Sequence, residues 1–333
     1  MCVGEPFWNP ASASGFLLDW DGVIAETNLD FSGLRQKYFG GRPAMLLEEA
    51  GSLPDGLRES MLAEMAEIET EGARRAAPVP GAFELLAKLE ERKIPFCILS
   101  RNSGEIIRIG AEAIGLTLPA FTWGRDDMKW VKPDPRALLE ASRAMGADAR
   151  RCVYVGDFLY DLEGARRAGM RAVLVQREEP AWDCWCDAAY PKLTDLVAAL
   201  DDTTPLVPWE YREIYARKGE KWMNRVSQMI FALPETPSPT ADCWLARAAA
   251  LGVGAFYIDP ERVFSPDDWK RNPSFDTGAM GRKWADVARD FLAPRYPLAR
   301  VVTERTEDVI NAPKNSLDLM RFIERRKTVR ARA

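Results

Sequence analysis

Two aspartates four residues apart, Asp157 and Asp161, follow an apolar segment that ends in Gly156. That spacing places both carboxylates on one face of a helical turn beside the end of a strand. Carboxylates gathered in this way repel one another unless a cation lies between them. Oxygen ligands without histidine or thiolate favour Mg²⁺. The pattern therefore predicts a magnesium site at this position.

A second pair of aspartates, Asp19 and Asp21, follows the apolar segment Gly15–Leu18, and Gly22 comes next. Gly22 lets the backbone turn tightly and approach a ligand closely. Taken alone, an Asp-x-Asp-Gly sequence after a strand is more typical of simple turn chemistry. The pair becomes a catalytic candidate only when it is combined with the other polar segments.

Another apolar segment ends in Ser100 and continues into Arg101 and Asn102. The spacing of Asn102 and Glu105 is a capping pattern, so we expect Asn102 to cap the helix that follows. Backbone N–H groups at a helix start can bind an anion, although an ordinary cap gives the same pattern.

A lysine, Lys132, precedes Pro133, and Asp134 and Pro135 suit the cap and first position of a further helix. A lone lysine at such a place is usually exposed to solvent.

These segments lie within an alternation of short apolar runs and helical patterns that extends through the first 200 residues. Such alternation is typical of an α/β fold, a Rossmann-like parallel sheet with helices on both faces. The expected strands are Gly15–Leu18, Pro95–Leu99, Cys152–Val155 and Arg171–Val175, and the expected helices are Ala82–Glu91, Glu105–Ile114, Arg136–Met145, Leu162–Ala168 and Lys192–Leu200. Because open parallel sheets bind ligands at the carboxyl ends of their strands, we expect the polar segments to meet at one edge.

The domain organisation follows from the places where this alternation stops. A helical insert over about 28–78 indicates a small cap after the first strand of a core that spans 1–200. Polar residues and two prolines over 201–208 indicate a linker. Residues 209–333 are expected to form a C-terminal α/β or α+β domain of unknown function, with helices Ala241–Leu251 and 282–292 and strands Val253–Ile258 and Leu298–Val302.

The composition excludes several classes of protein. The 333 residues include no histidine, so catalytic triads and histidine-based metal sites are ruled out. A net charge of −5 argues against a nucleic-acid binder. Neither a signal peptide nor a long apolar run is evident, so we expect a cytoplasmic protein without a membrane segment. Cys184, Cys186 and Cys243 are too few ligands to favour a zinc site.

In their order along the chain, the four polar segments resemble the motifs of the haloacid dehalogenase (HAD) superfamily: Asp19-Trp-Asp21-Gly22-Val, Ser100, Lys132 and Gly156-Asp157-x-x-x-Asp161. The resemblance covers about residues 15–200. The short cap, with Asn28-Leu-Asp-Phe31 and Leu53-Pro-Asp-Gly56, is similar to that of small-cap phosphatases akin to phosphoglycolate phosphatase.

This resemblance implies a mechanism. Asp19 would be the nucleophile that forms an aspartyl-phosphate, and Asp21 would be the general acid and base. The second Asp distinguishes the phosphatases of this superfamily from its dehalogenases. Mg²⁺ would be held by Asp19, the Asp21 carbonyl and Asp157, with Asp161 supporting the site or orienting Lys132. Groups expected to bind the phosphate of a small phosphorylated metabolite are Gly22, Ser100, Arg101, Asn102 and Lys132.

Other interpretations stay open at this point. A sugar phosphomutase of the same superfamily would use the same motifs, and a phosphonate hydrolase would need a cap lysine, for which Lys37 is the candidate. A third interpretation is a binding or scaffold protein with the C-terminal domain as its interaction module. The cap residues that could select a substrate, Arg35, Lys37, Arg42 and Arg58, could equally be surface charges.

Overall fold

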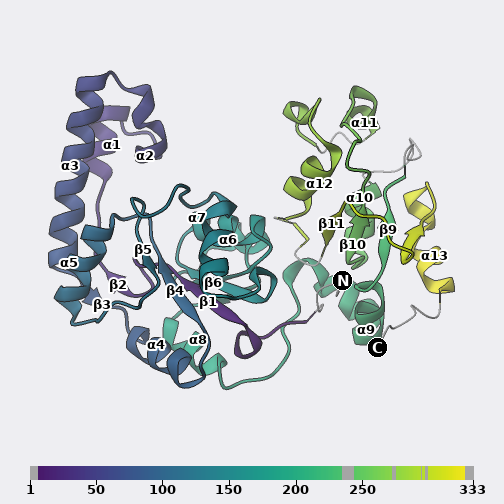
Figure 1. The fold of residues 1–333 in the computed structure, drawn as a ribbon, viewed down its shortest axis with the longest axis horizontal. Helices are drawn as coiled ribbons and strands as arrows, with labels where there is room; N and C mark the ends of the chain where they lie inside the picture. The colour runs from purple at the N-terminus through teal and green to yellow at the C-terminus, as the bar shows by residue number, and fades with distance from the viewer. Residues whose placement is uncertain (1–6, 235–243, 272–274, 294, 297–298, 327–333) are drawn as a thin grey trace.

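A six-stranded parallel sheet forms the centre of the first part of the chain (Figure 1). The structure is a computed structural model that describes residues 7–234, 244–271, 275–293, 295–296 and 299–326. The strand order is β5-β4-β1-β6-β7-β8, and each neighbouring pair is parallel. The strands are β1 Gly15–Leu18, β4 Phe96–Leu99, β5 Thr122–Trp123, β6 Cys152–Gly156, β7 Arg171–Val175 and β8 Ala188–Tyr190.

Helices cover both faces of this sheet, as the sequence predicts. Successive residues of a strand point to opposite faces. In β1, Phe16 and Leu18 pack under α4, α5 and α8, whereas Leu17 packs under α6 and α7. The helices are α4 Ala82–Glu91, α5 Gly104–Ile114, α6 Pro135–Ala144, α7 Leu159–Arg167 and α8 Leu193–Ala199.

A helical cap is inserted between β1 and α4 and extends away from the sheet (Figure 1). It consists of α1 Ser32–Phe39, α2 Leu46–Glu49 and α3 Asp55–Arg74, and the antiparallel pair β2 Ala25–Glu26 and β3 Ala77–Pro78 lies at its base. The cap has its own small core around Met61 and Met65. The cap therefore buries part of its apolar surface within itself, and α3 also packs against α5 of the core.

The C-terminal region contains a separate four-stranded sheet of order β11-β10-β9-β12 (Figure 1). All of its strand pairs are parallel, so the region is α/β rather than α+β. Its core is aromatic and includes Phe231, Phe256 and Trp284. The elements are α9 Arg212–Val226, β9 Ile230–Ala232, α10 Trp244–Ala250, β10 Ala255–Tyr257, α11 Pro266–Arg271, α12 Trp284–Leu292, β11 Arg300–Val302, β12 Val309–Asn311 and α13 Leu319–Arg325.

The expected elements agree with the structure apart from a few boundaries. Helix α5 begins at Gly104, and Ser103 is its cap instead of Asn102, because the Ser103 hydroxyl accepts the Ile106 N–H. Helix α7 begins at Leu159 instead of Leu162. The cap role of Asp134 is confirmed, since its carboxylate accepts the Arg136 N–H.

Parts of three predictions lie outside the described residues: the start of the expected helix 241–251, the start of the expected strand 298–302, and Cys243. The division of the chain at 201–208 stays a prediction. In the part of the chain that the structure describes, no helix is both long enough and apolar enough to span a membrane.

Candidate active site

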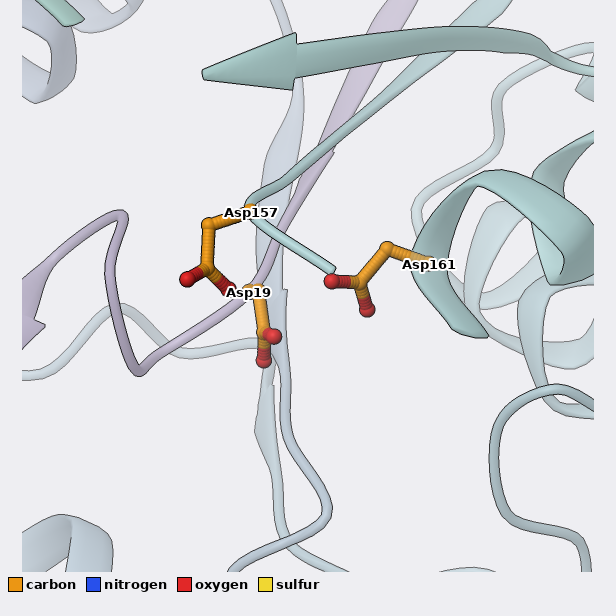
Figure 2. A group of neighbouring side chains, drawn as sticks. All are labelled: Asp19, Asp157 and Asp161. Carbon is orange, nitrogen blue, oxygen red and sulfur yellow. The ribbon is translucent and has the colours of Figure 1, made fainter. Parts of the chain in front are cut away.

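Three aspartates from two strand ends converge at the carboxyl edge of the central sheet. Asp19 follows β1, Asp157 follows β6, and Asp161 lies in the first turn of α7. Each offers a carboxylate oxygen, and these oxygens all lie within 4.8 Å of one another. Figure 2 shows the three side chains gathered around a common space. The sequence therefore correctly predicted that these aspartates meet.

A buried lysine, Lys132, lies beside the cluster. Its Nζ is 2.7 Å from Asp19 Oδ1 and 2.7 Å from Asp161 Oδ1, and its side chain is 2% exposed. Burial opposes its charge, but Asp161 and Asp19 outweigh that effect and raise the pKa of Lys132. Burial and repulsion from Asp161 raise the pKa of Asp19 despite the lysine. The lysine is therefore not the solvent-exposed residue that its sequence context alone would suggest.

Two glycines allow this close approach. Gly22 has a φ of +69°, and a Cβ there would lie 2.5 Å from the Asp157 carboxyl carbon. A Cβ at Gly156 would lie 2.3 Å from Asp161. A side chain at either position would displace a carboxylate, so both glycines shape the cluster.

The second aspartate of the first motif, Asp21, points its carboxylate to other partners. It accepts a hydrogen bond from the Asn102 amide at 2.7 Å and another from the Thr27 hydroxyl. Burial raises the pKa of Asp21, although both hydrogen bonds act in the opposite direction. Asp21 is thus oriented by two neutral donors and disposed to hold a proton.

The Ser100 segment lies at the end of β4 beside these aspartates. Ser100 is buried, and its hydroxyl accepts the Asn102 N–H at 3.0 Å. Arg101 donates to the Lys132 carbonyl at 2.6 Å and to Glu48 of the cap at 2.6 Å. The Arg101 side chain therefore links the cap to the lysine segment.

Arg177, which the sequence analysis did not identify, lies two residues after β7 and donates to Asp157 Oδ2 at 3.2 Å. Burial and Asp161 raise the pKa of Asp157 to about 6, and Arg177 opposes that rise. The position after a strand end could have revealed Arg177, but no recognisable motif surrounds it.

A cavity of about 440 Å³ lies between the cluster and the cap. This volume suits a small metabolite. Of the four basic cap residues considered above, only Arg35 lines the cavity. The other three pair with carboxylates at the cap surface: Lys37 with Glu64, Arg42 with Glu49, and Arg58 with Asp55. The position of Lys37 therefore argues against a Schiff base in this cavity.

The cap is tied to the sheet by a nearly buried ion pair between α3 and the segment after β5. Arg125 donates through both terminal nitrogens to the two oxygens of Glu69, at 2.8 and 2.9 Å. The Glu69 side chain is 5% exposed and that of Arg125 is 21% exposed. A bidentate pair of this kind fixes both position and orientation. It holds the cap over the cavity.

The structure explains the positions of Trp20, in the first motif, and Cys186, one of the three cysteines considered for a zinc site. Trp20 is fully buried and packs against Gly110 of α5, so it supports the sheet end and does not line the cavity. Burial raises the pKa of the Cys186 thiol to about 12, which opposes metal binding through a thiolate.

The residues present fit a hard divalent cation. The three clustered side chains offer carboxylate oxygens, and the two neighbouring glycines leave room for them to converge. Oxygen-only ligand sets of this type suit Mg²⁺. The donor chemistry supports a divalent cation without identifying which one.

Comparison with known proteins agrees with this geometry. Residues 34–175 match the family model described as haloacid dehalogenase-like hydrolase. This part of the chain is therefore similar to haloacid dehalogenase-like hydrolases.

Its relatives include phosphoglycolate phosphatases from two bacteria. The Mesorhizobium japonicum protein is 36% identical over 104 residues, which are 30% of this chain and 45% of that protein. The Caulobacter vibrioides protein is 31% identical over 132 residues, which are 38% of this chain and 55% of that protein. The chain thus spans about half the length of these curated relatives. A solved hydrolase structure from Pseudomonas syringae is 22% identical, covers 57% of this chain and 99% of its own, and has a TM-score of 0.49.

Proposed function

We propose that this protein is a Mg²⁺-dependent phosphatase that hydrolyses a small phosphorylated metabolite through an aspartyl-phosphate intermediate. The observation that carries the proposal is the convergence of Asp19, Asp157 and Asp161 beside buried Lys132. The phosphatases among the relatives support the same chemistry. A cytoplasmic location is part of the proposal and agrees with the free thiols of Cys97 and Cys152.

Asp19 is the proposed nucleophile. Its carboxylate is held by Lys132 on one oxygen, and the Trp20 N–H donates to the same oxygen at 2.7 Å. These contacts fix the carboxylate toward the cavity that Asp19 lines. Attack on phosphorus forms the bond from Asp19 oxygen to phosphorus and breaks the bond to the leaving oxygen.

Asp21 is the proposed general acid and base. Its raised pKa favours the protonated form that can donate to the leaving oxygen, and Thr27 and Asn102 hold the carboxyl group in position. After the alcohol leaves, ionised Asp21 can take a proton from the water that attacks the aspartyl-phosphate.

Asp19, Asp157 and the backbone carbonyl of Asp21 would hold the cation, and Asp161 would support them. When bound, Mg²⁺ supplies positive charge that offsets repulsion between the phosphate and the carboxylates. Gly22, Ser100, Arg101, Asn102 and Lys132 are the proposed phosphate-binding groups. Lys132 contributes a fixed charge from beneath the cavity, where it costs no reorganisation during the reaction.

The experiment is a phosphate-release assay over a panel of phosphorylated metabolites with Mg²⁺, using wild type, Asp19→Asn and Asp134→Asn. The control residue Asp134 is a helix cap paired with Arg136 and lies outside the cavity. We expect Asp19→Asn to abolish release, Asp134→Asn to retain it, and EDTA to remove it reversibly. Release that survives Asp19→Asn contradicts the mechanism, and isomerisation of a sugar phosphate without release indicates a mutase.

A further inference from the structure

A second cavity, of about 710 Å³, lies between the central sheet and the C-terminal region. Its wall includes the segments before β1, β6 and β7, together with the last turn of α7. These segments mark the amino edge of the central sheet, opposite the edge that carries the aspartates. Helix α12 and strand β11 supply the other side. The cavity is therefore separate from the candidate active site.

Arginine dominates the wall of this cavity. The 22 lining residues include seven arginines and a single acidic residue, Asp148, in a chain whose net charge is −5. The arginines are Arg150, Arg151, Arg166, Arg167, Arg171, Arg289 and Arg300. Carboxylates of the chain pair with several of these arginines, and an anionic ligand can offset the positive charge that remains. This concentration of charge favours an anionic ligand.

One of these arginines forms a rigid part of the wall. The Arg166 side chain is fully buried and pairs with Glu210 at 2.6 Å and with Asp187 at 3.5 Å. Arg171 also pairs with Asp187, at 3.3 Å. Two internal carboxylates thus hold the guanidinium groups on this side in place, so the site is built into the fold.

Other arginines of the wall remain available to a ligand. Arg151 is exposed and makes no ion pair with any residue that the structure describes. Arg167 and Arg289 pair with nearby carboxylates of their own segments. Exposed pairs of this kind contribute little, about 0–1 kcal/mol, so a phosphate can compete for these guanidinium groups. Guanidinium groups also bind phosphate oxygens in bidentate fashion.

The remainder of the wall is aromatic and aliphatic. Phe7, Trp8 and Tyr296 contribute rings, and Leu292 and Val301 contribute aliphatic surface. Aromatic side chains and guanidinium planes both stack on planar rings. The volume also matches that of pockets for small organic ligands. The wall therefore offers contacts for phosphate groups and for a flat apolar group together.

From this combination we propose that the cavity binds an organic phosphate that carries a planar ring, the chemistry of a nucleotide. The arginines bind the phosphate groups, and the aromatic side chains contact the ring. A small ligand is favoured over a nucleic acid because the arginines line a bounded cavity and the chain as a whole is acidic. This site is distinct from the proposed phosphatase site and does not depend on that function.

The test measures binding of ADP, inorganic pyrophosphate and adenosine to the full chain by titration calorimetry in EDTA. The double variant Arg151→Ala/Arg289→Ala removes one exposed arginine from each side of the cavity. The matched control Arg108→Ala/Arg143→Ala removes two exposed arginines that line neither cavity. We expect the Kd for ADP to rise at least tenfold in the first variant and by less than twofold in the control. Adenosine should bind more weakly than ADP.

A third variant tests the ring contact. Tyr296→Ala should weaken ADP binding several-fold and leave pyrophosphate binding within twofold of wild type, because pyrophosphate has no ring. The following results would overturn the proposal: no ADP binding at about 1 mM, equal affinities in the two double variants, or ADP binding that Lys132→Met abolishes while its circular dichroism spectrum stays that of the folded protein. The last result would place the ligand at the catalytic edge. Tight binding of single-stranded RNA without ADP binding would also contradict it.

Discussion

Replacing the buried lysine with methionine, Lys132→Met, tests whether its ion pairs with Asp19 and Asp161 contribute to the stability of the protein. The Lys132 Nζ lies 2.7 Å from an oxygen of Asp19 and 2.7 Å from an oxygen of Asp161. At an effective dielectric constant of about 20, each attraction is worth about 6 kcal/mol before desolvation. Desolvation offsets much of this, but removing one partner from a buried pair typically costs about 3–5 kcal/mol.

We therefore expect Lys132→Met to lower the melting temperature by about 6–20 °C in EDTA, measured by circular dichroism. The matched control is Lys37→Met, because Lys37 makes an ion pair of similar length, 2.6 Å, at the exposed cap surface. That pair is worth about 0–1 kcal/mol. In the phosphate-release assay, kcat of Lys132→Met should be about 10²–10³-fold lower than that of wild type. A melting temperature within about 2 °C of wild type would refute the reasoning.

Three further predictions concern residues around the two cavities. Gly22→Ala should raise the Mg²⁺ concentration needed for half-maximal activity about 10–100-fold, because the added Cβ would meet Asp157. The control is Gly115→Ala: Gly115 has a similar positive φ but open space where a Cβ would lie, so the Mg²⁺ requirement should stay unchanged. Burial raises the pKa of Glu210 from 4.5 to about 7. The unfolded carboxyl ionises first, so the contribution of Glu210 to stability falls by roughly 3 kcal/mol as pH rises from 4.5 through 7. Glu210→Gln should remove this contribution from the difference between melts at pH 5 and 8. Glu69→Gln removes the carboxylate that pairs with Arg125, so it should lower the free energy of unfolding by about 1.5–3 kcal/mol and raise KM. An unchanged KM would mean that this ion pair does not position the cap.

The sequence predicted that these polar residues meet at the carboxyl edge of the sheet because that prediction depends on topology alone. Asp19, Ser100 and Asp157 each follow an apolar strand, and the carboxyl ends of parallel strands must lie at one edge. The strands β1 and β7 were predicted with their observed bounds because each is a short apolar segment with polar residues directly after it.

What the sequence could not predict depends on partners from distant segments. Glu69 follows Met61 and Met65 at four-residue spacing on the buried face of α3, where its carboxylate is paired because Arg125 reaches it from 56 residues away. Arg125 follows β5, a strand of two residues that is too short to give a pattern. Asn102 was expected to cap α5, but its amide donates to Asp21 and the neighbouring Ser103 takes the cap. A local pattern cannot distinguish these outcomes.

The opposite characters of the two cavities have a common physical cause in α7. In a parallel α/β layer the helices run against the strands, so each helix N-terminus lies at the carboxyl edge of the sheet. The N-terminal end of a helix favours negative charge and the C-terminal end favours positive charge. Helix α7 follows this rule with Asp161 in its first turn and Arg166 and Arg167 in its last turn. Its dipole therefore helps to gather carboxylates at the carboxyl edge and arginines at the amino edge. An acidic chain can thus hold a carboxylate cluster and an arginine-lined cavity at opposite ends of the same helix.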